Sequence, residues 1–252
     1  MSSDLQPPTS ISILGVRVHD VTMAETLAWI EAAVAARAPH QVCTANPEFI
    51  VAAQSDAEFR DLLNRADLVI PDGIGLLWAA RWRGQRFRER VAGSDLIYRL
   101  CERAARRGWQ VYFLGAAEGV AERAADRLQA LSPGLLVTGA FSGSPRLEEN
   151  DAIVARVQAA QPDVLMVAYG APAQDQWIAR NLHQLNVPVS LGVGGAFDFV
   201  AGVAQRAPVW MQRIGLEWLH RLYRQPWRAR RIFNAALVFP WLVMFHGRRS
   251  QT

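Results

Sequence analysis

The segment from residue 191 to residue 202, Leu-Gly-Val-Gly-Gly-Ala-Phe-Asp-Phe-Val-Ala-Gly, has the composition of a ligand-binding loop. It continues the apolar run Val187–Val193, which is typical of a buried strand. Gly194 and Gly195 then leave backbone N–H groups accessible, because no side chain keeps a ligand away from them. Such a turn can hold an anionic or sugar-phosphate group, although glycines at this point can also serve only to turn the chain.

Asp72 follows another short apolar run, Leu68–Ile70, and precedes Gly73 and Gly75. A carboxylate fixed at the end of a strand can take a proton from an attacking hydroxyl group, so Asp72 is our candidate general base. The alternative is an aspartate that only caps a helix or closes a turn.

Three further polar residues also come directly after strand-like runs. Thr44 and Asn46 can cap the helix that Pro47 begins, and they can contact a ligand from the same positions. Gln174, at the start of a helix, can read sugar hydroxyl groups or pack against the domain, whereas the nearby Trp177 is expected to pack in the core.

These residues lie between strand-like and helix-like segments that alternate along the chain. The alternation predicts an α/β fold, a Rossmann-like, mostly parallel sheet with helices on both faces. The strands are expected at Ile11–Val18, Gln41–Ala45, Leu68–Ile70, Gln110–Leu114, Leu135–Thr138, Val164–Ala168 and Val187–Val193. The helices are expected after the capping box Thr22–Glu25 and at Pro47–Asn64, Ser94–Arg107, Val120–Leu131, Glu148–Ala160 and Ala173–Leu185.

Ligands of such a sheet bind beyond the carboxyl ends of its strands. Five loops are therefore expected to surround one crevice: residues 44–48, 71–75, 115–119, 169–174 and the glycine-rich loop after Val193. Together they offer hydroxyl, amide, carboxylate and backbone N–H groups.

All 27 basic residues are arginines, which excludes a lysine Schiff base and a P-loop lysine. Nine arginines and one acidic residue fall within 206–252, so this part carries a net charge of +8 and the rest of the chain −4. We therefore divide the chain into a flexible N-terminus (1–10), a Rossmann-like catalytic domain (11–205) and a helical, basic appendage (206–252). An anionic partner is expected for the appendage.

The appendage contains an apolar run of fourteen residues, Ile232–Phe245, which is shorter than the ~20 residues that a spanning helix needs. Arginines beside Trp218, Trp227 and Trp241 are typical of a segment that lies on an anionic membrane surface. A nucleic-acid partner is not expected, because no helix-turn-helix, finger or RNP-like motif accompanies the arginines.

The first ten residues lack a basic region followed by an apolar region, so we expect no signal peptide and a cytoplasmic protein. Cys43 and Cys101 are the only cysteines and are expected in the core. No Asp-x-Asp, His-x-x-x-His or Cys-x-x-Cys occurs, so neither a metal nor another cofactor is expected. The glycine-rich loop lacks the last glycine of the dinucleotide fingerprint, and no Gly-x-Ser-x-Gly is present.

Six blocks in order give the chain a family resemblance that extends over nearly all residues after 10. They are Thr44-Ala-Asn-Pro-Glu48, Pro71-Asp-Gly-Ile-Gly75, Glu89-Arg-Val-Ala-Gly-Ser-Asp-Leu96, Tyr169-Gly-Ala-Pro-Ala-Gln-Asp-Gln-Trp177, Gly192-Val-Gly-Gly-Ala-Phe-Asp-Phe199 and Gly215-Leu-Glu-Trp-Leu219. In these blocks the chain resembles the WecG/TagA/CpsF glycosyltransferases, glycosyltransferase family 26. The resemblance implies an inverting, metal-independent transfer of a hexose or N-acetylhexosamine, such as N-acetylmannosamine or glucose, from a UDP-sugar to a sugar on a polyprenyl diphosphate.

The resemblance also implies roles for single residues. Asp72 would be the base, Arg90 a partner of the appendage, and Thr44, Asn46 and Gln174 would contact sugar or nucleotide. The diphosphate would meet Arg221, Arg228 and Arg231. The chain departs from the usual Gln-Glu and Glu-Pro of the family with Gln174-Asp175 and Gln225-Pro226, and the second change removes an acid from the appendage.

The resemblance places the enzyme in cell-surface polysaccharide synthesis, on the inner face of the cytoplasmic membrane. The sequence leaves open whether the chain forms a homo-oligomer. Two alternatives stay open as well: an NAD-type oxidoreductase on the same fold class, and a non-catalytic scaffold at the membrane in which Asp72 is only a turn residue.

Overall fold

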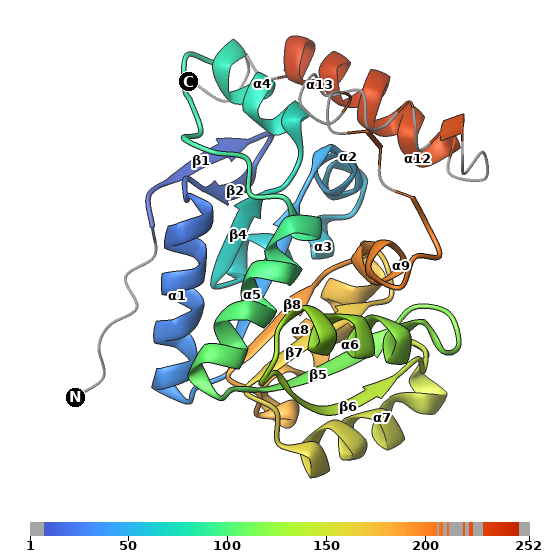
Figure 1. Cartoon of the computed structure of the whole chain (residues 1–252). Helices are drawn as coiled ribbons and strands as arrows, with labels where there is room; N and C mark the ends of the chain where they lie inside the picture. Colours follow the sequence, from blue (N-terminus) through green and yellow to red (C-terminus); the bar gives the residue numbers. More distant parts are fainter. Residues whose placement is uncertain are drawn as a thin grey trace.

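A parallel sheet of six strands, in the order β4-β3-β8-β7-β5-β6, forms the centre of the computed structural model (Figure 1). The structure describes residues 8–205, 207–208, 211, 219, 222–223 and 229–246. The strands of this sheet are β3 (His40–Ala45), β4 (Leu68–Pro71), β5 (Gln110–Gly115), β6 (Leu136–Phe141), β7 (Val164–Ala168) and β8 (Val189–Gly192). The predicted α/β fold with a mostly parallel sheet is confirmed.

Helices cover both faces of the sheet and leave three buried apolar clusters between the layers. On one face α1 (Met23–Ala36), α5 (Gly93–Arg107), α6 (Val120–Leu131) and α9 (Ala196–Val200) pack on the strands. On the other face, α7 (Leu147–Ala160) and α8 (Ala173–Leu185) cover β5 and β7. The third cluster joins β3 and β4 to α2 (Pro47–Ser55), α3 (Ala57–Arg65) and α4 (Ile74–Trp82). Cys43, Cys101 and Trp177 are buried as predicted, and the Thr22–Glu25 capping box is present.

The first predicted strand, Ile11–Val18, is wrong as a strand of the parallel sheet. The chain turns back at Leu14 and Gly15, which both have positive φ angles, and forms an antiparallel hairpin of β1 (Ser10–Ile13) and β2 (Val16–His19). A two-residue turn of this kind suits the right-handed twist of paired strands. Residues 1–7 of the predicted flexible N-terminus lie outside the described residues.

The predicted helix Pro47–Asn64 is two helices. Asp56 has an extended backbone, ends α2, and accepts a hydrogen bond from the backbone N–H of Phe59 at 2.9 Å, which caps α3. Helix α4 was not predicted from the sequence, and it directly follows the Pro71–Gly73 turn.

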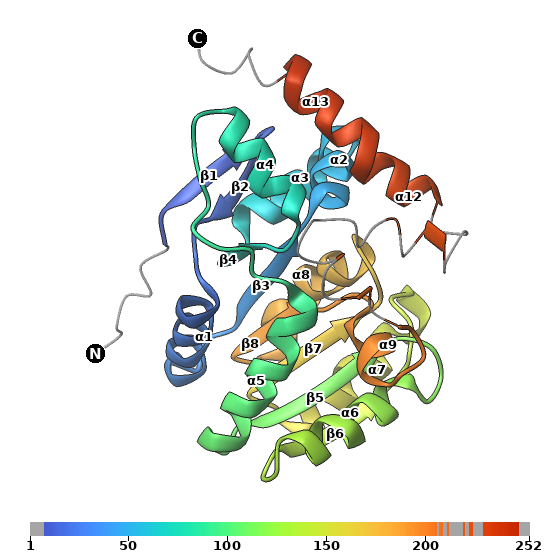
Figure 2. The ribbon, with the colours of Figure 1, turned by 45° about the horizontal axis from the view of Figure 1, so that its top comes forward.

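The last described residues form one helical segment, which packs against helices from the first third of the chain. It consists of α12 (Ala229–Phe233), the π-helical η2 (Asn234–Val238) and α13 (Phe239–His246), and we call it the C-terminal helix. It lies over α2 and α4, as both ribbon views show (Figure 2). Phe239 and Val243 belong to the buried cluster of α2, α3 and α4.

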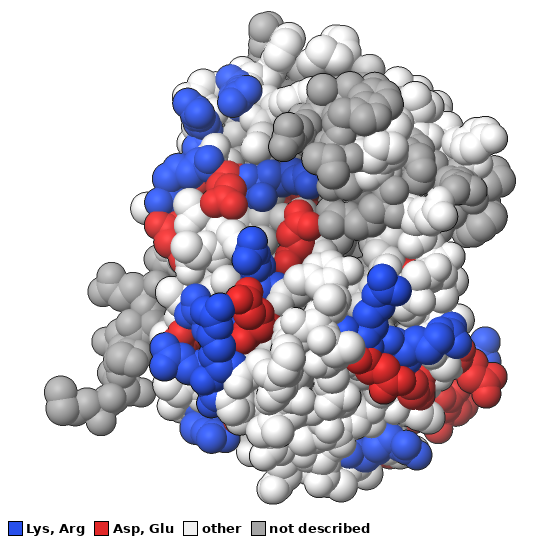
Figure 3. Space-filling model, viewed as in Figure 1, with Lys and Arg blue, Asp and Glu red and all other residues white. Residues whose placement is uncertain are grey.

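Charges of both signs alternate on the face of the molecule seen in Figure 3. Arg88 pairs with Asp20 at 3.0 Å and with Glu25 at 2.7 Å. These pairs hold the segment after α4 against the start of α1. The basic residues of the described domain are thus partly neutralised by neighbours, in line with its negative net charge.

Candidate functional site

A cavity of about 650 Å³ opens beyond the carboxyl ends of β3, β4, β7 and β8. Its lining includes seven of the predicted site residues: Thr44, Asn46, Asp72, Arg90, Gln174, Gly194 and Gly195. The strand-end rule thus placed these residues together correctly. The loop of residues 115–119, which was also expected there, does not contribute to the cavity because β5 lies two strands away from β8.

The other three predicted residues belong to the appendage. Arg221 and Arg228 lie outside the described residues. Arg231 is in α12, but the position of its side chain is not described. Their predicted contact with a diphosphate therefore stays a prediction.

Asp72 stands where β4 ends and its side chain faces the cavity. Its backbone N–H donates to the carbonyl oxygen of Ala45 at 2.8 Å, so the turn that carries it is tied to the neighbouring strand β3. A Cβ placed on Gly93 would lie 3.5 Å from the Asp72 Oδ2 and 3.4 Å from the Thr44 Cγ2. Asp72 and Thr44 therefore meet at the N-terminus of α5, whose dipole presents its positive end to this part of the cavity.

Thr44 and Asn46 have structural partners and still face the cavity, as the sequence predicted. The Thr44 hydroxyl donates to the carbonyl oxygen of Gly192 at 3.1 Å. The Asn46 amide oxygen caps α2 by accepting from the backbone N–H groups of Glu48 and Phe49, at 2.9 and 3.2 Å. The amide nitrogen is then the group of Asn46 that can contact a ligand.

Gln174 is 1% exposed and holds the glycine-rich loop. Its Oε1 accepts from the backbone N–H of Gly194 at 3.0 Å. A Cβ on Gly192 would collide with the Gln174 Nε2, so only glycine permits this approach. The structure thus gives Gln174 a positioning role on the loop, which the sequence did not indicate, and its contact with a ligand stays a prediction.

Asp175 is a fully buried carboxyl group beside the site, and sequence reasoning had singled it out only as a departure from the family pattern. Burial raises the pKa of Asp175 to about 7. The same burial, together with the nearby Asp175 carboxyl, raises the pKa of the Cys43 thiol well above its ordinary value. No sequence signal marks Asp175 as buried, because Asp in the first turn of a helix is normally solvated.

Arg90 is a cation of the cavity that forms no ion pair among the described residues. Its neighbour Arg88, two residues earlier, is engaged by two carboxylates. Arg90 is therefore positioned to meet an anionic group in the cavity.

The far end of the cavity is apolar. Trp78 and Trp82 of α4 form one wall, and residues of the C-terminal helix form the other. On that helix the cavity-facing residues are Ile232, Ala235, Ala236, Phe239, Pro240, Val243 and Met244. The cavity thus joins a polar end at the strand ends to an apolar end under the C-terminal helix.

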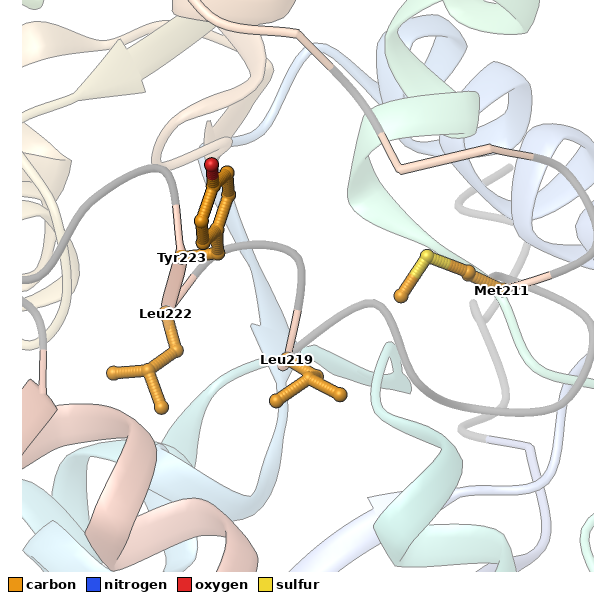
Figure 4. A pocket seen from close by; sticks show the side chains of 4 residues that line it. All are labelled: Met211, Leu219, Leu222 and Tyr223. Atoms are coloured by element: carbon orange, nitrogen blue, oxygen red, sulfur yellow. The ribbon is translucent and has the colours of Figure 1, made fainter.

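A second cavity, of about 500 Å³, is lined by Met211, Leu219, Leu222 and Tyr223 (Figure 4). Of the predicted site residues that the structure describes, none lines it. Among the described residues no helix combines the length and the apolar character needed to cross a bilayer. The same residues contain no group of three or more His, Cys, Asp or Glu side chains that could hold a metal ion.

The chain is similar to known proteins over most of its length. Residues 11–252 match the glycosyl transferase WecG/TagA/CpsF family. An N-acetylglucosaminyldiphosphoundecaprenol N-acetyl-beta-D-mannosaminyltransferase of Bacillus subtilis (strain 168) is 32% identical over 193 residues, which are 77% of this chain and 75% of the relative.

Proteins of the same name give similar values. The one from Bacillus spizizenii is 33% identical over 83% of this chain and 80% of its own length. The one from Staphylococcus aureus (strain MRSA252) is 30% identical over 84% of this chain and 83% of its own length. With a match over nearly its whole length, the chain belongs to the WecG/TagA/CpsF family of glycosyl transferases.

Proposed function

We propose that this protein is an inverting glycosyltransferase that moves a hexose or N-acetylhexosamine from a UDP-sugar to a sugar on a polyprenyl diphosphate. The observation that carries the proposal is the single cavity in which a carboxylate, Asp72, and a cation, Arg90, lie at one end and apolar side chains at the other. A sugar-diphosphate-lipid acceptor has three complementary parts in a row: a sugar hydroxyl, an anionic diphosphate and an apolar chain. The names of the relatives favour N-acetylmannosamine as the donor sugar and N-acetylglucosaminyl-diphosphoundecaprenol as the acceptor.

In the proposed reaction the Asp72 carboxylate takes the proton of the attacking acceptor hydroxyl. The acceptor oxygen forms a bond to the anomeric carbon of the donor from the face opposite to UDP, and the bond from that carbon to the UDP oxygen breaks. Inversion follows from this single displacement. Thr44 and Asn46 would contact sugar or nucleotide, beside the loop that Gln174 holds.

The electron pair of the broken bond leaves with UDP, whose negative charge needs stabilisation. Arg90 together with Arg221, Arg228 and Arg231 would bind the diphosphate groups, and bidentate guanidinium contacts serve this purpose well. We therefore expect transfer to proceed without an added metal ion, which transfer in the presence of a chelator would test.

Peripheral contact with the inner face of the cytoplasmic membrane is part of the proposal. The C-terminal helix exposes Phe233, Leu237, Trp241 and Phe245, which are spaced four residues apart and therefore share one face. Such an exposed apolar face, with arginines in the same segment, suits the boundary between lipid headgroups and acyl chains.

The test is a transfer assay with purified protein, a set of UDP-sugars and N-acetylglucosaminyl-diphosphate lipid. We expect Asp72→Asn to keep UDP binding and to lower kcat by about 10²–10⁴-fold, the usual range for loss of a general base. Asp126→Asn, which changes an exposed carboxylate on α6, is the control and should transfer as the wild type does. Wild-type turnover of Asp72→Asn would remove the assignment of the base, and binding of NADH without UDP would favour the oxidoreductase.

A further inference from the structure

The two faces of the C-terminal helix contain different residues with different surroundings. The residues that line the cavity and the residues of the exposed face, Phe233, Leu237, Trp241 and Phe245, do not overlap. Phe239 and Val243 are 2% and 5% exposed, whereas Phe245 is 62% exposed. The same helix therefore packs against the domain with one face and leaves a second apolar face to the surroundings.

Opposite the cavity-lining face of the C-terminal helix, α4 contributes two largely exposed tryptophans. Trp78 is 59% exposed and Trp82 is 68% exposed, and both line the cavity. Because they are four residues apart on α4, their indole rings share one side of that helix. Large exposed apolar surface of this kind marks a binding site in a folded protein.

The groove between α4 and the C-terminal helix is continuous with the polar end of the cavity. Pro47 and Phe239 both approach Gly75 at the start of α4, which brings the C-terminal helix close to the turn that holds Asp72. The C-terminal helix contains no acidic residue from 229 to 246. A ligand that fills the groove must therefore have an uncharged apolar part on one side and a part suited to Asp72 and Arg90 on the other.

We infer that this groove binds the first isoprene units of the acceptor lipid, and that α4 is as much a part of the lipid site as the C-terminal helix. The inference rests on the proposed function, because only a lipid whose head is a diphosphate sugar would occupy both ends of the cavity. A branched hydrocarbon chain covers Trp78 and Trp82 and then leaves the groove toward the exposed face of the C-terminal helix. Lipid recognition and membrane contact then belong to different residues.

Binding without transfer separates this inference from the proposed function. Calorimetry would compare farnesyl diphosphate with inorganic diphosphate as ligands of the full-length protein. We expect the wild type to bind farnesyl diphosphate about 10–100-fold more tightly, as burial of a few isoprene groups against aromatic rings implies. The Trp78→Ala, Trp82→Ala double variant should lose most of this difference, since the two rings are exposed and their removal leaves the core intact.

Two control variants locate the effect. Leu131→Ala with Leu147→Ala removes exposed apolar side chains of α6 and α7 that do not line the cavity, and it should keep the preference for farnesyl diphosphate. Leu237→Ala with Phe245→Ala should weaken binding to anionic liposomes and also keep that preference. Equal affinities of the wild type for the two ligands, or an undiminished preference in the tryptophan double variant, would overturn the inference. Absence of sugar transfer alongside tight farnesyl diphosphate binding would instead contradict the proposed function.

Discussion

Replacement of Asp175 by Asn tests how the interior beneath the site is stabilised. Asp175 lies in the first turn of α8 and is fully buried, and this burial raises the pKa of its carboxyl group from the ordinary 3.8 to about 7. Neither carboxyl oxygen has a hydrogen-bond partner of normal geometry among the residues that the structure describes. The Cys43 thiol and the Gln174 side chain are close enough to oppose part of the shift. The folded protein therefore keeps Asp175 neutral at pH values where the unfolded chain has lost the proton.

The sign of the effect follows from the two pKa values. Between about pH 4 and pH 7 the folded state binds a proton that the unfolded state has released, so the free energy of unfolding falls as pH rises through this range. The stabilisation that comes from the neutral Asp175 carboxyl group of the folded state is complete below about pH 4 and lost above about pH 7. A difference of about 3 pKa units corresponds to about 4 kcal/mol, at 1.36 kcal/mol per unit. Asp175→Asn cannot ionise and should lack this dependence.

Denaturant unfolding at several pH values measures the effect. From about pH 4.5 to pH 8 the wild type should lose about 3 kcal/mol relative to Asp175→Asn, while other carboxyl groups contribute equally to both proteins. Asp61→Asn, which changes an exposed carboxylate on α3, should parallel the wild type and serves as the control. Parallel curves for the wild type and Asp175→Asn would refute the reasoning, because they would mean that the Asp175 carboxyl group is hydrated or ionised in the folded state.

Two further substitutions test the loop and the C-terminal helix. Gly192→Ala should lower kcat/KM at least about tenfold and the stability by about 1–3 kcal/mol, because the added Cβ would collide with the Gln174 amide that holds Gly194. Wild-type kinetics of this variant in the transfer assay would contradict the role of Gln174. Phe239→Ala should lower the free energy of unfolding by about 3–5 kcal/mol, since Phe239 is 2% exposed in the cluster with α2 and α4. Phe233→Ala, at an exposed position of the same helix, should change it by less than about 0.5 kcal/mol, and equal losses would mean that the helix does not pack on the domain as the structure has it.

The polar end of the cavity was predictable because its residues lie at, or directly after, the carboxyl ends of apolar runs. Thr44 is the last but one residue of β3, and Asp72 and Gly194 come after β4 and β8; these strands are adjacent or next to adjacent in the sheet. In a parallel sheet the carboxyl ends of such strands meet at one edge, so sequence order and strand type suffice to bring the residues together. The hairpin at Leu14 and Gly15 was missed because its two strands together have the length of one.

The apolar end was not predictable in the same way. Helix α4 has the sequence Ile-Gly-Leu-Leu-Trp-Ala-Ala-Arg-Trp, in which apolar residues occur on every side, so no periodicity separates a buried from an exposed face. The side of α4 that faces the cavity is set by the C-terminal helix, which begins 147 residues after α4 ends. Contacts of such sequence separation leave no trace in local pattern. The burial of Asp175 on α8 also depends on distant residues, Cys43 of β3 and Gly192 of β8.

The two ends of the cavity, one placed by the sheet and one by distant helices, also separate the two roles that we propose: proton transfer and lipid contact. The group that would take the proton, Asp72, is fixed by the sheet, because the turn that carries it is bonded to Ala45 of the neighbouring strand. The lipid-contacting wall belongs to α4 and the C-terminal helix, whose position depends on Phe239 and Val243 packing into the cluster beneath them. Substitutions on the exposed side of that helix can therefore change membrane affinity without displacing the base. Deletion of residues 206–252, in contrast, would remove buried side chains as well as the proposed membrane contact, so loss of activity in such a truncated protein would follow from either cause.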